Sequence, residues 1–171
     1  MRRVAGYLIA LAVLTAGCGS SSSSSPSATP LVFAAHILPS NELFNIQGGE
    51  TSGSGDAQIT FNVTKDSSGT ITKADATFNV QLVGFPTATA FNLAHIHVGG
   101  PTVNGGIVVG TGIVAGDVTN TNGTASFQKV SLNVDPATMQ AIINNPAGYY
   151  FNVHTTANPS GVARGQLTRL Q

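Results

Sequence analysis

Hydrophobic and polar residues alternate over much of the chain from residue 31 onward, which is the pattern of strands with one buried face. The clearest case is the segment 57–63, Ala-Gln-Ile-Thr-Phe-Asn-Val, in which every second residue is apolar. The alternation resumes over 70–83 after a turn sequence at 66–69, so the two segments predict a β-hairpin. Further strands are predicted from β-branched and aromatic runs bounded by Gly, Pro or Asn at 31–38, 91–98, 107–114, 125–132, 149–155 and 163–170.

One segment carries the signals of a helix. Asp135 is a predicted N-cap, Pro136 occupies the first helical position, and an apolar stripe follows until an Asn-Asn-Pro sequence ends the helix near residue 144. Residues 39–55 are predicted as a loop, because their Gly-Gly and Ser-Gly-Ser-Gly sequences are too flexible for a regular element. About eight short strands and one short connecting helix exclude a βαβ architecture. They predict an all-β fold, an antiparallel β-sandwich or flattened Greek-key barrel, over residues 31–171.

Two of the predicted strands carry three of the four histidines. Side chains two apart on a strand point to the same face, so His95 and His97 are expected to project together, on the side shared with Phe91 and Leu93. In the strand 149–155, His154 shares a face with Asn152 and is set apart from the apolar row. The spacing does not say whether these two strands are neighbours.

The beginning of the chain has the pattern of an export signal. Arg2 and Arg3 precede a short apolar stretch, and small residues stand before the single cysteine, Cys18. This order resembles the bacterial lipobox, in which cleavage occurs before the cysteine and its thiol then carries diacylglycerol; an ordinary secretory signal is the alternative. We predict a signal peptide at 1–17, then a lipidated cysteine and a disordered Ser/Pro tether at 18–30. The protein is therefore expected in the cell envelope or at the surface, anchored to a membrane by its lipid.

Charged residues are sparse and nearly balanced. Seven Lys and Arg stand against seven Asp and Glu, and removal of Arg2 and Arg3 leaves five against seven, a net charge of −2. The absence of a basic patch from the sequence argues against nucleic acid as a partner. No serine has a Gly-x-Ser-x-Gly setting, and Glu42 and Glu50 lie in one predicted loop, not on rigid strands as a glycosidase pair requires. The sequence therefore predicts no catalytic residue.

Several motifs, in order, resemble the CHRD domain, which is named after its repeats in animal chordin and is common in bacterial exported proteins. They are Ala-His-Ile-His-Val-Gly-Gly at 94–100, Asn-Gly-Gly-Ile-Val-Val at 104–109, Tyr-Phe-Asn-Val-His-Thr at 150–155, Asn-Pro-Ser-Gly at 158–161 and Arg-Gly-Gln-Leu at 164–167. The resemblance implies a β-sandwich in an extracytoplasmic location, and it implies little chemistry. Our first functional hypothesis is therefore a membrane-anchored, non-enzymatic module that binds a protein or another envelope component.

A second hypothesis from a different class is a copper or zinc site formed by His95, His97 and His154, with His36 as a further candidate. Two histidines on one strand and one on a distant strand form a ligand set suited to either ion, because imidazole binds both. The arrangement resembles the copper-holding pattern of copper–zinc superoxide dismutase, as an analogy of motif and architecture. Redox activity would be the corresponding expectation.

Arg164 and Asn152 are candidate supporting residues for the same histidines. Arg164 is either an anion-guiding group beside a metal or a partner for a carboxylate or backbone carbonyls. The alternative to a metal is a buried polar network, in which the three histidines, Asn152 and Arg164 satisfy one another and nearby carbonyls. The sequence leaves both interpretations open.

Overall fold

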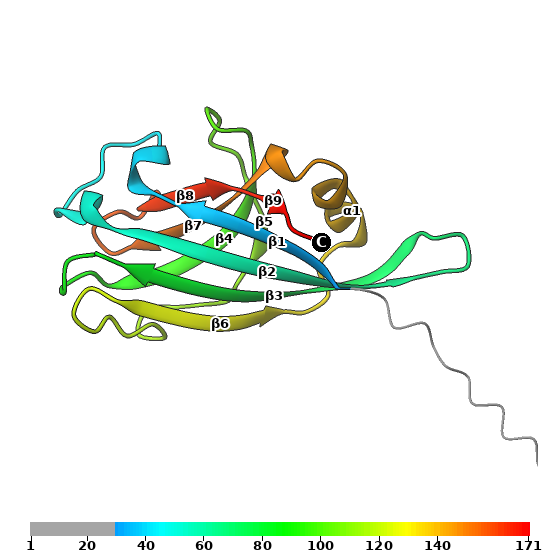
Figure 1. The fold of residues 1–171 in the computed structure, drawn as a ribbon, viewed down its shortest axis with the longest axis horizontal. Helices are drawn as coiled ribbons and strands as arrows, with labels where there is room; N and C mark the ends of the chain where they lie inside the picture. Colours follow the sequence, from blue (N-terminus) through cyan, green and yellow to red (C-terminus); the bar gives the residue numbers. More distant parts are fainter. Residues whose placement is uncertain (1–29) are drawn as a thin grey trace, which may run out of the picture.

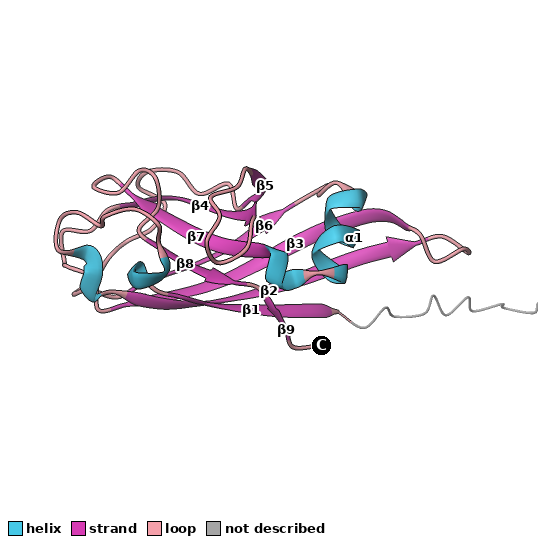
Figure 2. Cartoon of the chain, turned by 90° about the horizontal axis from the view of Figure 1, so that it is seen from above, coloured by secondary structure: helices cyan, strands magenta, loops and turns pink. Residues whose placement is uncertain are grey.

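The computed structural model describes residues 30–171, which form two antiparallel sheets packed face to face (Figure 1). The first sheet has the strand order β6-β3-β2-β1-β9 and the second has the order β5-β4-β7-β8. The strands are β1 (Leu31–Ile37), β2 (Ser54–Lys65), β3 (Ile71–Val83), β4 (Phe91–Val98), β5 (Ile107–Gly110), β6 (Ala125–Ser131), β7 (Tyr149–Thr155), β8 (Ala163–Gln166) and β9 (Thr168–Arg169). The two sheets share no strand, and Figure 2 shows β1 and β2 on one side of the domain and β4 and β7 on the other, so the predicted sandwich is confirmed and the barrel alternative is not.

The core lies between the two sheets and is filled by the apolar half of each alternating strand. The hairpin of β2 and β3 supplies much of it, with Ile59 paired opposite Phe78 and both fully buried. Phe78 also reaches across to Phe151 on β7, with the ring centroids 5.8 Å apart. Burial of each such side chain contributes roughly 1.5–3 kcal/mol, which makes this face the main source of stability.

The predicted helix is confirmed as α1 (Pro136–Asn144). The carboxylate of Asp135 accepts a hydrogen bond of 2.9 Å from the backbone N–H of Thr138, as expected of an N-cap. Met139 and Ile142 are buried against the sandwich. Figure 1 shows α1 beside the end of the first sheet from which the tip of the β2–β3 hairpin projects.

The region 39–55 is more ordered than predicted. It contains the 3-10 turns η1 (Pro39–Asn41) and η2 (Glu50–Ser52), and β2 already begins at Ser54. A loop through residue 55 was therefore a wrong prediction. Gly55 pairs opposite Leu82, and a side chain there would lie 2.7 Å from the carbonyl oxygen of Gln81, so this glycine allows close strand approach.

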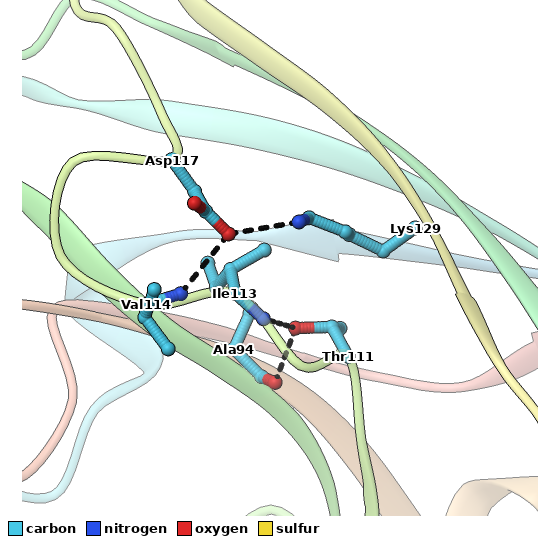
Figure 3. A network of polar contacts seen from close by, with 6 residues as sticks. All are labelled: Ala94, Thr111, Ile113, Val114, Asp117 and Lys129. Carbon is cyan, nitrogen blue, oxygen red and sulfur yellow. Dashed lines mark hydrogen bonds and ion pairs between the residues drawn. The ribbon is translucent and has the colours of Figure 1, made fainter.

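The fifth predicted strand, 107–114, ends four residues early at Gly110, and Figure 3 shows the polar contacts of the segment that follows it. The hydroxyl of Thr111 donates to the carbonyl of Ala94 and accepts from the N–H of Ile113, while Gly112 takes a positive φ of 77°. These features turn the backbone out of the second sheet. Lys129 on β6 donates to the carboxylate of Asp117 at 2.8 Å, and this contact holds the segment between β5 and β6 against the first sheet.

The last predicted strand, 163–170, is divided between the two sheets. β8 pairs with β7 in the second sheet, whereas β9 pairs with β1 in the first. Leu167 lies at the crossing point, where its side chain is buried and its N–H donates to the carbonyl of Tyr149. The burial of the Leu167 side chain favours this crossing. The crossing also covers the edge of β1, which one continuous strand in the second sheet would leave unpaired.

A bulge in β4 corrects the predicted face of Phe91. The register with β7 shifts between Phe91 and Leu93, which removes the simple alternation at this point. Phe91 is 2% exposed and packs edge-on against Phe85 in the core, whereas Leu93 is 40% exposed on the opposite face. Phe91 therefore does not share a face with the histidines. The two-residue period predicted that it would, and this prediction was wrong.

The predicted signal peptide, Cys18 and nearly all of the Ser/Pro tether lie outside the described residues. Within residues 30–171, no helix combines the length and the apolar character needed to cross a membrane.

Candidate metal centre

The strands that carry the three histidines are direct neighbours. β4 and β7 pair antiparallel, with His95 opposite Asn152 and His97 opposite Tyr150. The alternate residues of β4, such as Ile96, are buried in the core, so the histidines lie on the face of the second sheet that points away from the first. One potential ligand nitrogen from each of His95, His97 and His154 lies within 4.8 Å of the other two.

Backbone carbonyls fix the protonation of two of the rings. Nδ1 of His97 lies 3.0 Å from the carbonyl oxygen of Gly105, and Nδ1 of His154 lies 2.9 Å from that of Pro159. A carbonyl oxygen can only accept, so each Nδ1 carries a proton and donates it. Each neutral ring therefore keeps its lone pair on Nε2, the atom that would bind a metal.

The third ring is oriented by the second. Nδ1 of His95 lies 3.3 Å from Nε2 of His154, and because that Nε2 is an acceptor, His95 donates the proton. Nε2 of His97 is buried and has no hydrogen-bond partner within residues 30–171. Such an atom is costly unless something satisfies it.

All three histidines are held in the neutral form. Burial is the main cause for each: it lowers the pKa of His95 to about 4, with further lowering from His154 and His97, and it lowers the pKa values of His97 and His154 as well. Hydrogen bonds to backbone carbonyls partly oppose the lowering in His97 and His154. Neutral imidazole is the form that binds metal ions, so little proton competition is expected at neutral pH.

Arg164 is buried beside the histidines, but it binds backbone carbonyls and not the rings. Its Nη2 donates to the carbonyls of Gly100, Pro101 and Val103 at 3.0–3.2 Å, and its Nη1 donates to Oδ1 of Asn104 at 2.9 Å. Arg164 is 1% exposed, so its guanidinium is bound by this loop instead of by water. Of the two roles predicted for it, the structure shows the carbonyl partner.

Tyr150 connects Arg164 to the histidines. The guanidinium carbon lies 3.9 Å from the Tyr150 ring centroid, as in a cation–π contact. The ring of His97 stacks on Tyr150 with centroids 4.9 Å apart and an interplanar angle of 6°. The stack and the bond to Gly105 together restrict rotation of the His97 ring.

Asn152 connects the site to the loop after β1. Its side-chain N–H group donates to Oε1 of Glu42 at 2.6 Å, while its own Oδ1 is buried without a partner in the described part of the chain. Burial raises the pKa of Glu42 from 4.5 to about 7, against the opposing effects of Arg164 and of this hydrogen bond. Asn152 thus contacts Glu42, and none of its hydrogen bonds reaches a histidine.

His36 is not brought to the cluster. It lies on β1 in the first sheet, where its Nδ1 is 2.8 Å from Oδ1 of Asp56 on β2. Both side chains are mostly exposed. The three-histidine set is therefore all that the structure assembles of the four predicted ligands.

Sequence reasoning missed four residues that shape the site. They are Glu42, Asn104, Gly105 and Tyr150. Tyr150 stands four residues before His154 on the same strand face, so the two-residue period carried a signal for it. The other three belong to irregular loops, where no periodicity says which way a side chain or carbonyl points.

These features define an antiparallel β-sandwich domain with a half-buried cluster of three histidines on the outer face of one sheet. The sequence model of the CHRD domain matches residues 33–167, and the chain belongs to this family. The family resemblance seen in the motifs is therefore confirmed. No curated protein and no solved structure matches the chain.

Substitution of Gly105 is expected to destabilise the loop over His97. A Cβ at Gly105 would lie 2.7 Å from the carbonyl carbon of Val98 and closer still to its oxygen, whereas one at Gly106 would meet nothing within 4 Å. Gly105→Ala should lower the free energy of unfolding by roughly 1–3 kcal/mol, the usual cost of an added group without space. Urea unfolding measures this, with Gly106→Ala as the neighbouring control; equal stability of the two variants would contradict the packing described.

The raised pKa of Glu42 predicts that the difference in stability between wild type and Glu42→Gln depends on pH. A carboxyl whose pKa is higher in the folded state favours folding below the unfolded pKa, and this contribution is lost as the pH rises from 4.5 through about 7. Gln keeps the oxygen that accepts from Asn152 but cannot ionise. As the pH rises from 5 to 8, the free energy of unfolding of the variant should therefore increase relative to that of the wild type by on the order of 2 kcal/mol, as measured by urea unfolding. A constant difference over this range would refute the assignment.

Proposed function

We propose that this CHRD domain binds one copper or zinc ion through His95, His97 and His154. The observation that carries the proposal is the buried Nε2 of His97, which has no partner in residues 30–171 although it belongs to a cluster of neutral imidazoles. A bound metal would satisfy this atom. The two carbonyls that bind Nδ1 of His97 and His154 resemble the outer partners that orient histidine ligands in metal sites.

The distances are close to those of a shared ion. Three nitrogens at 2.0–2.1 Å from a tetrahedral ion are separated by about 3.4 Å. The nitrogens of His95 and His154 are already 3.3 Å apart, and the whole set lies within 4.8 Å. Coordination through Nδ1 of His95 requires its proton to move to Nε2, which leaves the ring neutral. A modest rotation of one ring then completes a three-nitrogen site with an open position.

The proposal places this site outside the cytoplasm. The signal peptide at 1–17 and the lipidated Cys18 predicted from the sequence would export the domain and hold it at a membrane. Mass spectrometry of the membrane fraction tests this directly, since the mature chain should begin at a diacylated Cys18. A soluble product cut elsewhere would support the ordinary secretory signal instead.

Metal binding is tested by isothermal titration and elemental analysis of residues 30–171, the part that forms the complete sandwich. We expect one copper or zinc ion per chain and loss of that binding in the double variant His95→Ala/His97→Ala. Stoichiometric binding would justify assays for superoxide or peroxide chemistry. The absence of binding, with a double variant that is only less stable, would leave the histidines as part of a structural network.

A second candidate function is the non-enzymatic binding module expected from the family resemblance. It is favoured by the edge of the first sheet, where β6 pairs only with β3 among the described strands. Val130 and Leu132 at this edge are 53% and 66% exposed. An edge of this kind can accept a strand from a partner. Capture from envelope extracts that fails with Val130→Lys would support this function, and equal capture by both forms would reject this edge.

A further inference from the structure

The charges around the histidine cluster favour one oxidation state of one metal. We infer that the site is selective for Cu(I), which it binds more tightly than Cu(II) or Zn(II). This inference rests on the proposed metal binding and specifies its ligand. It follows from three features: the charge of the ligands, the charge of the side chains around them, and the number of ligands.

The ligand set carries no negative charge. The cluster that the structure assembles contains three histidines and, within residues 30–171, no carboxylate or thiolate joins it. His154 is buried, His97 is 9% exposed, and His95 is partly exposed. The cost of moving an ion out of water rises with the square of its charge, so a divalent ion loses more hydration energy here than a monovalent one. Neutral ligands do not compensate for that difference.

The surrounding side chains do not supply the missing negative charge. Arg164 is buried and positive, and it stacks on the same Tyr150 ring that packs against His97. Glu42 is the acid connected to the site, through Asn152. When Glu42 is ionised, the two charges cancel; when it is protonated, the positive charge of Arg164 remains. In neither state does the environment offset a second positive charge on the metal.

The number of ligands points the same way. Within residues 30–171, the cluster offers three nitrogens from two adjacent strands, and the fourth histidine is in the other sheet. Cu(I) has a filled d shell and accepts three nitrogen ligands, whereas Cu(II) prefers a tetragonal set and Zn(II) usually has four ligands. An ion that needs a fourth ligand would have to take it from water.

Leu93 offers a way to change the charge without touching a ligand. It lies on the same face as His95, is paired opposite His154, and is 40% exposed, so a polar side chain can be accommodated there. Leu93→Glu places a carboxylate beside the cluster. Leu93→Gln has nearly the same shape without the charge and is the matched control.

The experiment measures the dissociation constants of the 30–171 domain for Cu(I), Cu(II) and Zn(II) by competition with chromophoric chelators, under anaerobic conditions for Cu(I). We expect the wild-type Kd for Cu(I) to be at least tenfold lower than that for either divalent ion. Each tenfold preference over Cu(II) also raises the copper midpoint potential by about 59 mV, which voltammetry measures independently. Leu93→Glu should reduce the preference by tenfold or more, while Leu93→Gln should retain it.

The outcomes separate this inference from the proposal beneath it. If no ion binds, both are overturned. If Cu(II) or Zn(II) binds within tenfold of Cu(I), or more tightly, metal binding stands and the selectivity is refuted. If the Glu and Gln variants at position 93 behave alike, charge does not determine the selectivity, and the inference is overturned.

Discussion

Copper binding by the His97→Ala variant is expected to be weaker than that of the wild type by more than about 100-fold. Removal of an outer partner of a metal ligand already costs 10–100-fold in affinity, and His97 would itself be a ligand. Its Nε2 is the buried nitrogen that lacks a partner, and its orientation is fixed from two sides by Gly105 and Tyr150. Isothermal titration with a competing chelator measures the change.

The fourth histidine provides the control for that experiment. His36→Ala removes an imidazole from the exposed pair with Asp56 in the other sheet, so copper affinity should stay within a factor of two or three of wild type. Circular dichroism should show both variants folded. Equal loss of affinity in the two variants would indicate binding by scattered surface histidines, and no loss in His97→Ala would remove that residue from the site.

The sequence allowed the fold class and the shared face of His95 and His97 to be predicted, because both depend on the two-residue period; it did not exclude His36, which the structure places in the other sheet. The rows of apolar residues in 57–63 and 70–83 define one buried face, and the structure pairs them as β2 and β3. The same period places His95 and His97 on one face. The period fails at Phe91, where a bulge reverses the alternation, because an inserted residue leaves no trace in composition.

The surroundings of the histidines were beyond prediction because long-range contacts determine them. The pairing of β4 with β7 joins residues more than fifty positions apart, and strand signals do not specify which strands pair. Glu42 reaches Asn152 from a loop that looked flexible. Glu50, from the same loop, is buried, and its carboxylate accepts hydrogen bonds from the side chains of Thr155 and Asn158. Its location therefore also depends on the folded C-terminal part of the chain.

Replacement of Arg164 is expected to be the most destabilising polar change in the domain. Arg164→Met keeps the aliphatic stem but removes donors from four oxygens of the loop 100–104 and the cation–π contact with Tyr150. Loss of one partner from a buried charged network costs roughly 3–5 kcal/mol, because the acceptors left behind are desolvated. Urea unfolding should show a loss of this size.

Arg169→Met is the matched control for this prediction. Arg169 is exposed on β9, and its side chain donates only to the carbonyl of Gln171 within the described residues, so the cost should stay below about 0.5 kcal/mol. A loss below about 1 kcal/mol for Arg164→Met would mean that water replaces the guanidinium and that the network is not structural.

Arg164 is expected to orient the His97 ring in addition to stabilising the domain. The loop that it holds continues to Gly105, whose carbonyl accepts from Nδ1 of His97. Arg164→Met should therefore release the His97 ring as well, and nitrogen NMR should show its proton distributed between Nδ1 and Nε2 instead of fixed on Nδ1. Arg164→Lys keeps the charge but cannot span the same carbonyls, so it should show the mixed protonation too. A residue that only stabilised the sandwich would leave the His97 proton on Nδ1 in every folded variant.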